Sequence, residues 1–260
     1  MRRDGRRARP PRHLAAAPPP PDGLRRRRTM VAGFVLMAIG VACWVPNAQQ
    51  IARRHDAVAA YDALAPAGAG DVDWAELRAA NPDVVAWCRV EGAGIDLPVC
   101  QAKDDDPHRW LARDLWGGKS PAGTPYVDHR AGAESPHVLC YGHHLAGTGG
   151  MFSALGDCHA QDAFDRTLAG GLAWSTPQSS VRLRPLCASV VDQEDALVQR
   201  FDFAGVAELR AWLAGLVARS TAKATDAEAL AATATRAVTL VTCSSDVAGQ
   251  RGRTVVTFAA

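Results

Sequence analysis

The C-terminal stretch "TLVTCSSDVAGQRGR", residues 239–253, places Cys243 at the end of an apolar run and follows it with a loop and two arginines. Because side chains alternate between the two faces of a β-strand, Thr239, Val241 and Cys243 would share one face. Cys243 is therefore expected at the end of a strand, on the rim of a sheet. A cysteine there is either a buried structural thiol or a nucleophile, and a nearby cation or imidazole favours the nucleophile.

Two arginines follow Cys243, and strand periodicity separates them. The run "RTVVTFAA", residues 253–260, predicts a second strand that opens at Arg253. If the two strands pair as neighbours, Cys243 and Arg253 lie together at one edge of the sheet. Arg251 stands before Gly252 in the connecting loop, so periodicity does not fix its direction. We therefore expect Arg253 to be the neighbour of the cysteine.

A second chemistry-bearing segment is "HVLCYGHHLAGTGGMFSAL", residues 137–155. It reads as a strand that ends at Gly142, followed by His143 and His144 and a glycine-rich turn. A histidine at a strand end beside such a turn is well placed for acid–base chemistry. Two other interpretations remain: exposed loop histidines, or metal ligands together with Cys140. Adjacent strand residues face opposite ways, so a metal site would require an irregular loop.

The rest of the body combines many short strands with a few helices. Alternating apolar patterns predict strands within 84–100, 123–130 and 179–192, and residues 202–220 form the best amphipathic helix. The predicted fold class is mostly β with peripheral helices, as a barrel or a sandwich.

The N-terminus differs sharply in charge and composition from the body. Residues 1–29 carry ten arginines against two aspartates, a net charge of +8, which leaves −6 for the remainder. The proline-rich residues 1–28 lack apolar side chains to bury and are expected to be a disordered basic tail. Such a charge split indicates two compartments rather than a nucleic-acid-binding surface.

An apolar segment follows the basic tail and predicts a membrane anchor. Sixteen residues from Met30 carry no charge, and residues 29–48 just reach the length that spans a bilayer. "RRRR" directly precedes them, so the positive-inside rule places the tail in the cytoplasm and the body outside. Residues 49–70 are expected to form a helical stalk or linker, and residues 71–260 the catalytic domain. A cleaved signal peptide is the alternative, although no clear A-x-A site follows.

Seven cysteines are present, six of them outside the predicted anchor. Disulfides persist in exported domains, but these cysteines are scattered and lack C-x-x-C spacing. The sequence leaves the pairing open; Cys88 and Cys100, on successive predicted strands, are one candidate pair.

Several motifs together resemble the class B sortases, from about residue 70 to the end. "TLVTC" followed ten residues later by an arginine that opens a strand resembles the sortase cysteine–arginine signature. "YGHH" followed by "MFSAL" is similar to the segment that holds the sortase histidine. "NPDVVAWCRVEGAGIDLPVCQAKDDD" and "GTPYVDHR" resemble the opening strands of class B members, and the helix at 202–220 matches the one inserted between their sixth and seventh strands.

This resemblance implies an eight-stranded sortase-type β-barrel with a cysteine transpeptidase site and neither a cofactor nor a metal. Sortases are anchored in the membrane on the outer face of Gram-positive cells. They cleave a C-terminal sorting signal of surface proteins after Thr, form a thioester, and transfer the protein to an amino group of a peptidoglycan precursor or of a pilin-type partner protein. Carried over by position, the catalytic residues are Cys243, His143 and Arg253, and the residues expected near the substrate are Thr242, Val241 and His144. Some class B members carry a hydroxyl at the position of Val241.

Two other classes compete with this interpretation. A membrane-tethered metal- or haem-binding module would use His143, His144 and the cysteines. A papain-like protease also pairs cysteine with histidine, but its cysteine precedes the histidine and opens a helix, whereas here His143 comes first and Cys243 ends a strand.

Overall fold

The computed structural model describes residues 22–66, 72–145, 147–244 and 250–260. The chain divides into two compact units, Met1–Gln49 and Gln50–Ala260. Most of the predicted basic tail lies outside the described residues. The predicted anchor, residues 29–48, lies in the first unit, and the second unit holds all the described strands.

The first helix, α1 (Asp22–Asp62), runs from the end of the basic tail through the predicted anchor and into the predicted stalk. Residues 22–28 are therefore helical, although we expected them in the disordered tail. The segment Arg26–Asp62 is long and apolar enough to cross a membrane, with a window of mean hydropathy 2.0, and none of that window is buried. These properties agree with a membrane anchor, on length and composition alone.

The last turns of α1 belong to the second unit, where Tyr61 is fully buried. Its hydroxyl donates to the carbonyl of Gly123 (2.9 Å), lies 2.8 Å from Oγ1 of Thr124, and accepts from the backbone N–H of Leu115 (3.0 Å). The compact body thus begins near residue 50. The stalk expected at 49–70 and the catalytic domain expected from residue 71 stay a prediction; apolar periodicity does not reveal a single docked tyrosine.

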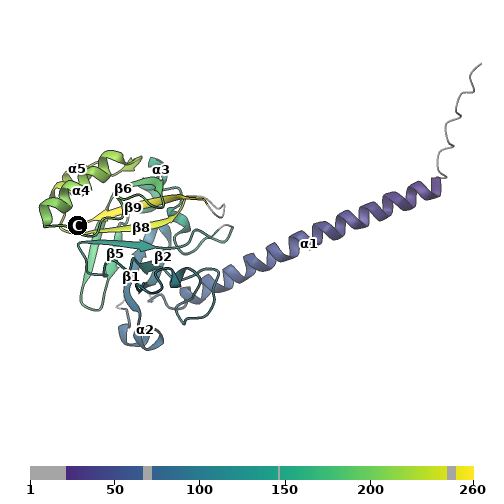
Figure 1. The fold of residues 1–260 in the computed structure, drawn as a ribbon, viewed down its shortest axis with the longest axis horizontal. Helices are drawn as coiled ribbons and strands as arrows, with labels where there is room; N and C mark the ends of the chain where they lie inside the picture. Colours follow the sequence, from purple (N-terminus) through teal and green to yellow (C-terminus); the bar gives the residue numbers. More distant parts are fainter. Residues whose placement is uncertain (1–21, 67–71, 146, 245–249) are drawn as a thin grey trace, which may run out of the picture. The chain divides into compact units, whose positions relative to one another are not determined.

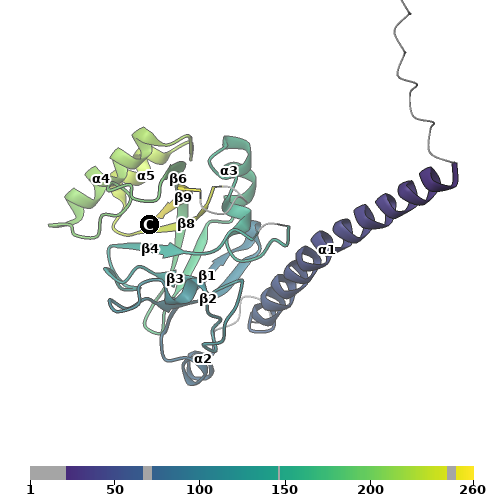
Figure 2. The same ribbon diagram turned by 45° about the vertical axis from the view of Figure 1, so that its right-hand side comes forward.

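A closed β-barrel forms the body (Figures 1 and 2). Eight strands close in the order β5-β1-β2-β3-β4-β8-β9-β6, because β6 pairs with β5, and the short β7 adds to the free side of β6. This confirms the predicted eight-stranded barrel. The strand bounds are β1 Val84–Val90, β2 Ile95–Gln101, β3 Tyr126–Val127, β4 His137–Tyr141, β5 Leu172–Ser175, β6 Ser180–Asp192, β7 Ala222–Lys223, β8 Ala237–Cys243 and β9 Gly252–Ala259.

Four further α-helices and three short 3-10 helices surround the barrel. They are α2 Trp74–Ala80, α3 Gln161–Leu168, α4 Val206–Arg219, α5 Ala227–Thr233, η1 Glu91–Ala93, η2 Arg109–Leu111 and η3 Ser153–Leu155. Helix α4 follows β6, as the sequence predicts. Figure 1 shows α4 and α5 side by side against one side of the barrel, close to β6 and β9.

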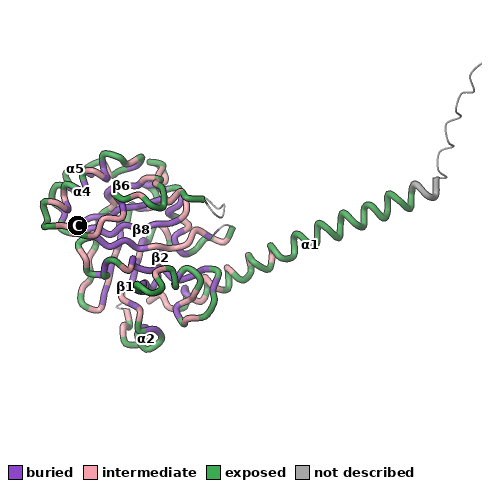
Figure 3. Tube along the Cα trace, in the orientation of Figure 1, coloured by how far each residue is buried: buried purple, intermediate pink, exposed green. Residues whose placement is uncertain are grey.

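Strand β8 lies between two apolar layers. Val238 and Leu240 belong to the core cluster inside the barrel, whereas Ala237 and Val241 pack in the cluster beneath α4 and α5. Burial on both faces explains why this strand reads as a continuous apolar run rather than an alternating one. In Figure 3 the strand is purple, the colour of buried residues, along nearly all of its length. Only at Cys243 does exposure rise.

All seven cysteines are free thiols. The candidate Cys88–Cys100 disulfide is wrong, because the β1–β2 register places Leu97 opposite Cys88 and Val84 opposite Cys100. Burial raises the pKa of five thiols in the body, to about 11 for Cys158 and to about 12 for Cys187. The others in this group are Cys88, Cys100 and Cys140.

Candidate active site

Cys243 and Arg253 face each other across two neighbouring strands. Cys243 is the last residue of β8, and the antiparallel register pairs it directly with Arg253 of β9. Directly opposed residues of antiparallel strands project to the same face, so the thiol and the guanidinium share one side of this sheet end. This is the neighbour relation that strand periodicity predicts. Cys243 is half-buried, in contrast to the five buried cysteines of the body.

Arg251 is engaged elsewhere. Its guanidinium forms a bidentate ion pair with Asp192 at the end of β6, with N···O distances of 2.8 and 2.7 Å, and lies 3.4 Å from Glu194. The hydrogen bonds to Asp192, first, and then to Glu194 raise the pKa of Arg251 above its ordinary value. The hydrogen bonds of Arg253 instead go to three uncharged oxygens: the carbonyls of Gln250 (2.7 Å) and Gly252 (3.0 Å) and Oε1 of Gln193 (3.0 Å). Within the described residues Arg253 thus keeps its charge unpaired, while Arg251 does not.

His143 reaches this end of the barrel from β4, the other neighbour of β8. β4 runs parallel to β8, and the backbone continues the pairing through the hydrogen bond from Gly142 N–H to the carbonyl of Val241 (3.0 Å). The imidazole Nε2 of His143 lies 2.7 Å from the carbonyl oxygen of Leu111. A carbonyl only accepts hydrogen bonds, so Nε2 carries a hydrogen and Nδ1 is left to exchange a proton. The Leu111 carbonyl thus orients the histidine, as a third group orients the base in other nucleophilic sites.

A groove with a volume of about 680 Å³ joins these three side chains. Cys243, His143 and Arg253 all line it, and its floor continues along the outward-facing residues of β4, β8 and β9. Residues 107–111 and 126–130 line further parts of it, as does the start of the segment that links β6 to α4. A groove of this size accommodates a peptide-sized ligand.

A buried ionic cluster supports the end of the groove formed by residues 126–130. Asp128 is 5 % exposed and receives a bidentate pair of hydrogen bonds from Arg130, both of 2.8 Å, and a third from the hydroxyl of Tyr141 (3.1 Å). Burial opposes the ionisation of Asp128, but the hydrogen bonds from Arg130 and Tyr141 outweigh it and hold the pKa of this carboxyl below its ordinary value. Tyr126 stacks on Tyr141 with ring centroids 5.3 Å apart. No sequence pattern marks these residues, because a carboxylate inside a strand pattern carries no periodic signal.

Arg130 and His137 fix the segment between β6 and α4, which forms a wall of the groove. Arg130 donates to Oε1 of Gln199 (2.9 Å), and its guanidinium lies 4.5 Å over the ring of Phe201. The fully buried His137 lies with Nδ1 2.7 Å from the carbonyl of Arg200. Burial lowers the pKa of His137 to about 4, so the ring is neutral at physiological pH. The wall is therefore held by side chains that come from the barrel itself.

The three residues expected near the substrate take different positions. Val241 lies on the same face as Cys243 and lines the groove floor at 4 % exposure. Thr242 also borders the groove, but its side chain points to the opposite face, and its buried Oγ1 has no hydrogen-bond partner among the described residues. His144 places Nδ1 2.9 Å from the main-chain carbonyl oxygen of Cys243.

The alternative metal-ligand set does not converge. Cys140 is fully buried in the barrel core, His143 bonds to the carbonyl of Leu111, and His144 bonds to that of Cys243. Across the described ranges, no three His, Cys, Asp or Glu side chains form a group that could hold a metal ion.

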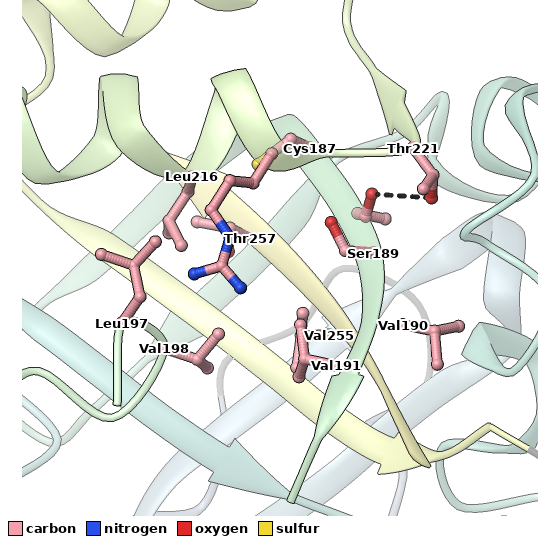
Figure 4. A pocket seen from close by; sticks show the side chains of 12 residues that line it. Cys187, Ser189, Val190, Val191, Leu197, Val198, Leu216, Thr221, Val255 and Thr257 are labelled. Carbon is pink, nitrogen blue, oxygen red and sulfur yellow. Dashed lines mark hydrogen bonds between the residues drawn. The ribbon is translucent and has the colours of Figure 1, made fainter. Parts of the chain in front are cut away.

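A second hollow, of about 70 Å³, lies between α4 and strands β6 and β9 (Figure 4). Leu216, Val255 and Cys187 line it, and the Cys187 thiol is 3 % exposed. The raised pKa of this buried thiol disfavours the reactive thiolate. This hollow is a packing space beneath α4 and carries no chemistry of its own.

Comparison with known proteins supports the fold. No protein-family model matches the chain. Sortase B of Listeria monocytogenes is 32 % identical over 82 residues, which span 31 % of this chain and about a third (32 %) of that protein. Sortase B of Clostridium perfringens superposes with a TM-score of 0.61 at 23 % identity, covering 71 % of this chain and 97 % of that one.

Two further solved structures contain bound molecules. A Staphylococcus aureus sortase B–substrate complex gives a TM-score of 0.59 at 22 % identity, over 72 % of this chain and 83 % of that one. A sortase B complexed with triglycine gives 0.58 at 22 % identity, over 72 % and 84 %. The chain thus has the fold of the class B sortases, which confirms the resemblance seen in its motifs.

Proposed function

We propose that this chain, which has the class B sortase fold, is a membrane-anchored cysteine transpeptidase that acts on C-terminal sorting signals of surface proteins. The observation that carries the proposal is the meeting of Cys243, Arg253 and His143 in one groove, the first two from the neighbouring strands β8 and β9 and the third from the residues that directly follow β4. Nucleophile, cation and acid–base group are the set that acyl transfer through a thioester requires.

In the first half-reaction, the thiolate Sγ of Cys243 attacks the carbonyl carbon of the Thr in the sorting signal. Nδ1 of His143 takes the proton of the Cys243 thiol as the thiolate forms. The C–N bond after that Thr then breaks, and the same Nδ1 gives this proton to the leaving amine. The acyl group remains on Cys243 as a thioester. Because Nε2 is held by the carbonyl of Leu111, the imidazole presents one nitrogen throughout and does not need to rotate.

Arg253 stabilises the oxygen of the attacked carbonyl while it carries negative charge. Its present acceptors are uncharged, so exchanging one of them for an oxyanion gains a charge-assisted hydrogen bond. Such a donor contributes roughly 3 to 4 kcal/mol to the transition state. Arg251 cannot take this role without breaking its ion pair with Asp192.

In the second half-reaction, a primary amine attacks the thioester carbonyl and forms the new C–N bond. Nδ1 of His143 takes the proton that the amine loses, the C–S bond breaks, and Cys243 leaves as the thiolate. The acceptor is an amino group of a peptidoglycan precursor or of a pilin-type partner protein. The sortase B complex with triglycine supports an amine acceptor of small size. Val241, Thr242 and His144, which surround Cys243, would lie close to the bound signal.

The proposed location is the surface of a Gram-positive cell. The apolar part of α1 would cross the membrane once, with the arginine-rich N-terminus in the cytoplasm and the barrel outside. This arrangement would place the groove where exported proteins and cell-wall precursors meet. Attaching a protease-accessible tag to each end of the chain in intact cells tests it, since only the C-terminal tag should be cleaved from outside.

Mass spectrometry of the unit 50–260 incubated with a library of sorting-signal peptides is the most informative test. We expect a mass increase on Cys243 that equals the peptide acyl portion through Thr, and its loss when an amine is added. A library that never acylates the protein would refute the proposal, whereas a peptide that does so would also identify the sorting motif.

Site variants separate the assigned roles. Cys243→Ala should abolish the thioester, and His143→Ala should remove activity. Arg253→Ala should reduce the acylation rate by about 10² to 10³-fold, while the matched Arg251→Ala should change it far less. A larger loss in Arg251→Ala than in Arg253→Ala would overturn the choice of arginine.

A further inference from the structure

We propose that His144 is a positioning residue for the nucleophile, which acts through the hydrogen bond from its Nδ1 to the main-chain carbonyl of Cys243, 2.9 Å away. This inference rests on the proposed function of Cys243. It gives His144 a role distinct from the contact with substrate that its place in the sequence suggests.

The direction of the Cys243 backbone explains why this bond is needed. In an antiparallel ladder, pairs that exchange backbone hydrogen bonds alternate with pairs that do not. The N–H of Ser244 bonds to the carbonyl of Gly252, so the preceding pair, Cys243 and Arg253, is one that does not. The Cys243 carbonyl therefore points away from β9, toward the side of β8 that β4 covers. The carbonyl of Val241 points to the same side of β8, where it accepts a hydrogen bond from the N–H of Gly142.

β4 has already ended where Cys243 needs its partner. The parallel ladder between β4 and β8 finishes at the pair Tyr141 and Val241, two residues short of the cysteine. Without a donor at that point, the last carbonyl of β8 would lose the bond that holds the strand end. The imidazole of His144 supplies the donor, so a side chain continues the ladder for one more step and fixes the residue that bears the thiol.

The ring of His144 is itself held in a tight space. A Cβ atom at Gly156 would lie 2.7 Å from Cε1 and 3.0 Å from Nδ1 of the ring, so only glycine leaves room for it. The carbonyl of Gly156 accepts a hydrogen bond of 2.7 Å from Oγ1 of Thr254 on β9. Thr254 directly follows Arg253, so the same packing links the ring to the strand of the proposed catalytic arginine.

The geometry specifies which nitrogen matters. A carbonyl only accepts, so Nδ1 is the donor. An asparagine side chain places its amide nitrogen near the position of a histidine Nδ1, whereas a glutamine places it near Nε2. His144→Asn should therefore keep the bond to Cys243, and His144→Gln and His144→Ala should lose it.

The experiment uses the full-length protein in detergent with the three His144 variants. We measure kcat and KM with a sorting-signal peptide, the rate of alkylation of Cys243 by iodoacetamide against pH, and the melting temperature. For His144→Ala and His144→Gln we expect kcat to fall about tenfold or more, with KM within about threefold and an altered alkylation profile, because a displaced nucleophile reacts poorly. His144→Asn should retain most of the wild-type rate and profile.

Two outcomes would overturn the proposal: an asparagine variant as impaired as the alanine variant, or a raised KM with unchanged kcat, which indicates a substrate contact. If His144→Ala does not fold, the comparison of His144→Asn with His144→Gln still tests the hydrogen bond to Cys243, since both variants keep a polar side chain. If the wild-type protein forms no acyl-enzyme, the function proposed for Cys243 fails. The alkylation profiles then still report whether His144 positions the thiol.

Discussion

Replacing Tyr61 by Phe tests whether the end of α1 is an integral part of the barrel domain. The change removes one hydroxyl that makes three contacts of 2.8 to 3.0 Å and leaves the ring in place. A hydrogen bond contributes about 1 kcal/mol net, and an unpaired buried donor such as Leu115 N–H adds its own cost. We therefore expect the free energy of unfolding to fall by about 3 kcal/mol, which corresponds to a melting temperature lower by about 6 to 12 °C for a domain of this size.

Differential scanning calorimetry of the unit 50–260 measures this shift, and Tyr126→Phe provides the matched control. Tyr126 is also buried, at 4 % exposure, but its hydroxyl makes no hydrogen bond within the described residues. The control should melt within about 2 °C of the wild type. A Tyr61→Phe protein that melts with the control would refute the reasoning, because α1 would then end as a free stalk.

Three further predictions concern the groove. Burial lowers the pKa of His137 to about 4, whereas the unfolded chain takes up the proton near pH 6.5. The free energy of unfolding should therefore stay constant above pH 6.5 and fall by about 3 kcal/mol as the pH drops from 6.5 to 4. Denaturant titrations at a series of pH values measure this fall, and His137→Asn should lack it. Arg130→Met should lower the free energy of unfolding in urea by about 3 kcal/mol, the low end for buried ion pairs because Arg130 is 42 % exposed. Adding Asp128→Asn should restore part of this free energy, because it removes the charge left without a partner. A double variant less stable than the single one would contradict this. In Gly142→Ala the new Cβ would lie 2.5 Å from the Phe152 ring, so the adjacent His143, the proposed acid–base group, should shift and acylation should slow by about tenfold or more. Phe152→Leu should restore the rate, and an unchanged rate in the single variant would show that the ring yields instead.

The sequence predicted the parts of the site that follow strand periodicity. Alternation along residues 239–253 placed Cys243 at a rim and made Arg253 its neighbour, and the β8–β9 register shows that pairing. The eight-stranded barrel and the helix after β6 were also predicted, the closed barrel through the motif resemblance. These features depend on patterns that are local in the chain.

The parts that sequence reasoning missed depend on contacts between distant segments. The Leu111 carbonyl that orients His143 is a backbone group, and every residue has one, so no residue type marks it. Tyr61 looked like one more residue of an exposed stalk until its partners near residue 123 were known. The predicted Cys88–Cys100 disulfide is wrong because two cysteines on consecutive strands need not lie opposite each other in the strand register.

The position of β8 between β4 and β9 has a consequence for the timing of activity. Strands β8 and β9 come after every other barrel strand along the chain, and β8 pairs with a strand about 100 residues upstream, as the bond between Gly142 and Val241 shows. Domains form as their chains emerge, so a partly emerged chain would already carry His143 but neither Cys243 nor Arg253. Cys243 thus arrives with the strands that close the barrel, and a chain that has not finished folding lacks the arrangement of side chains on which the proposed activity depends.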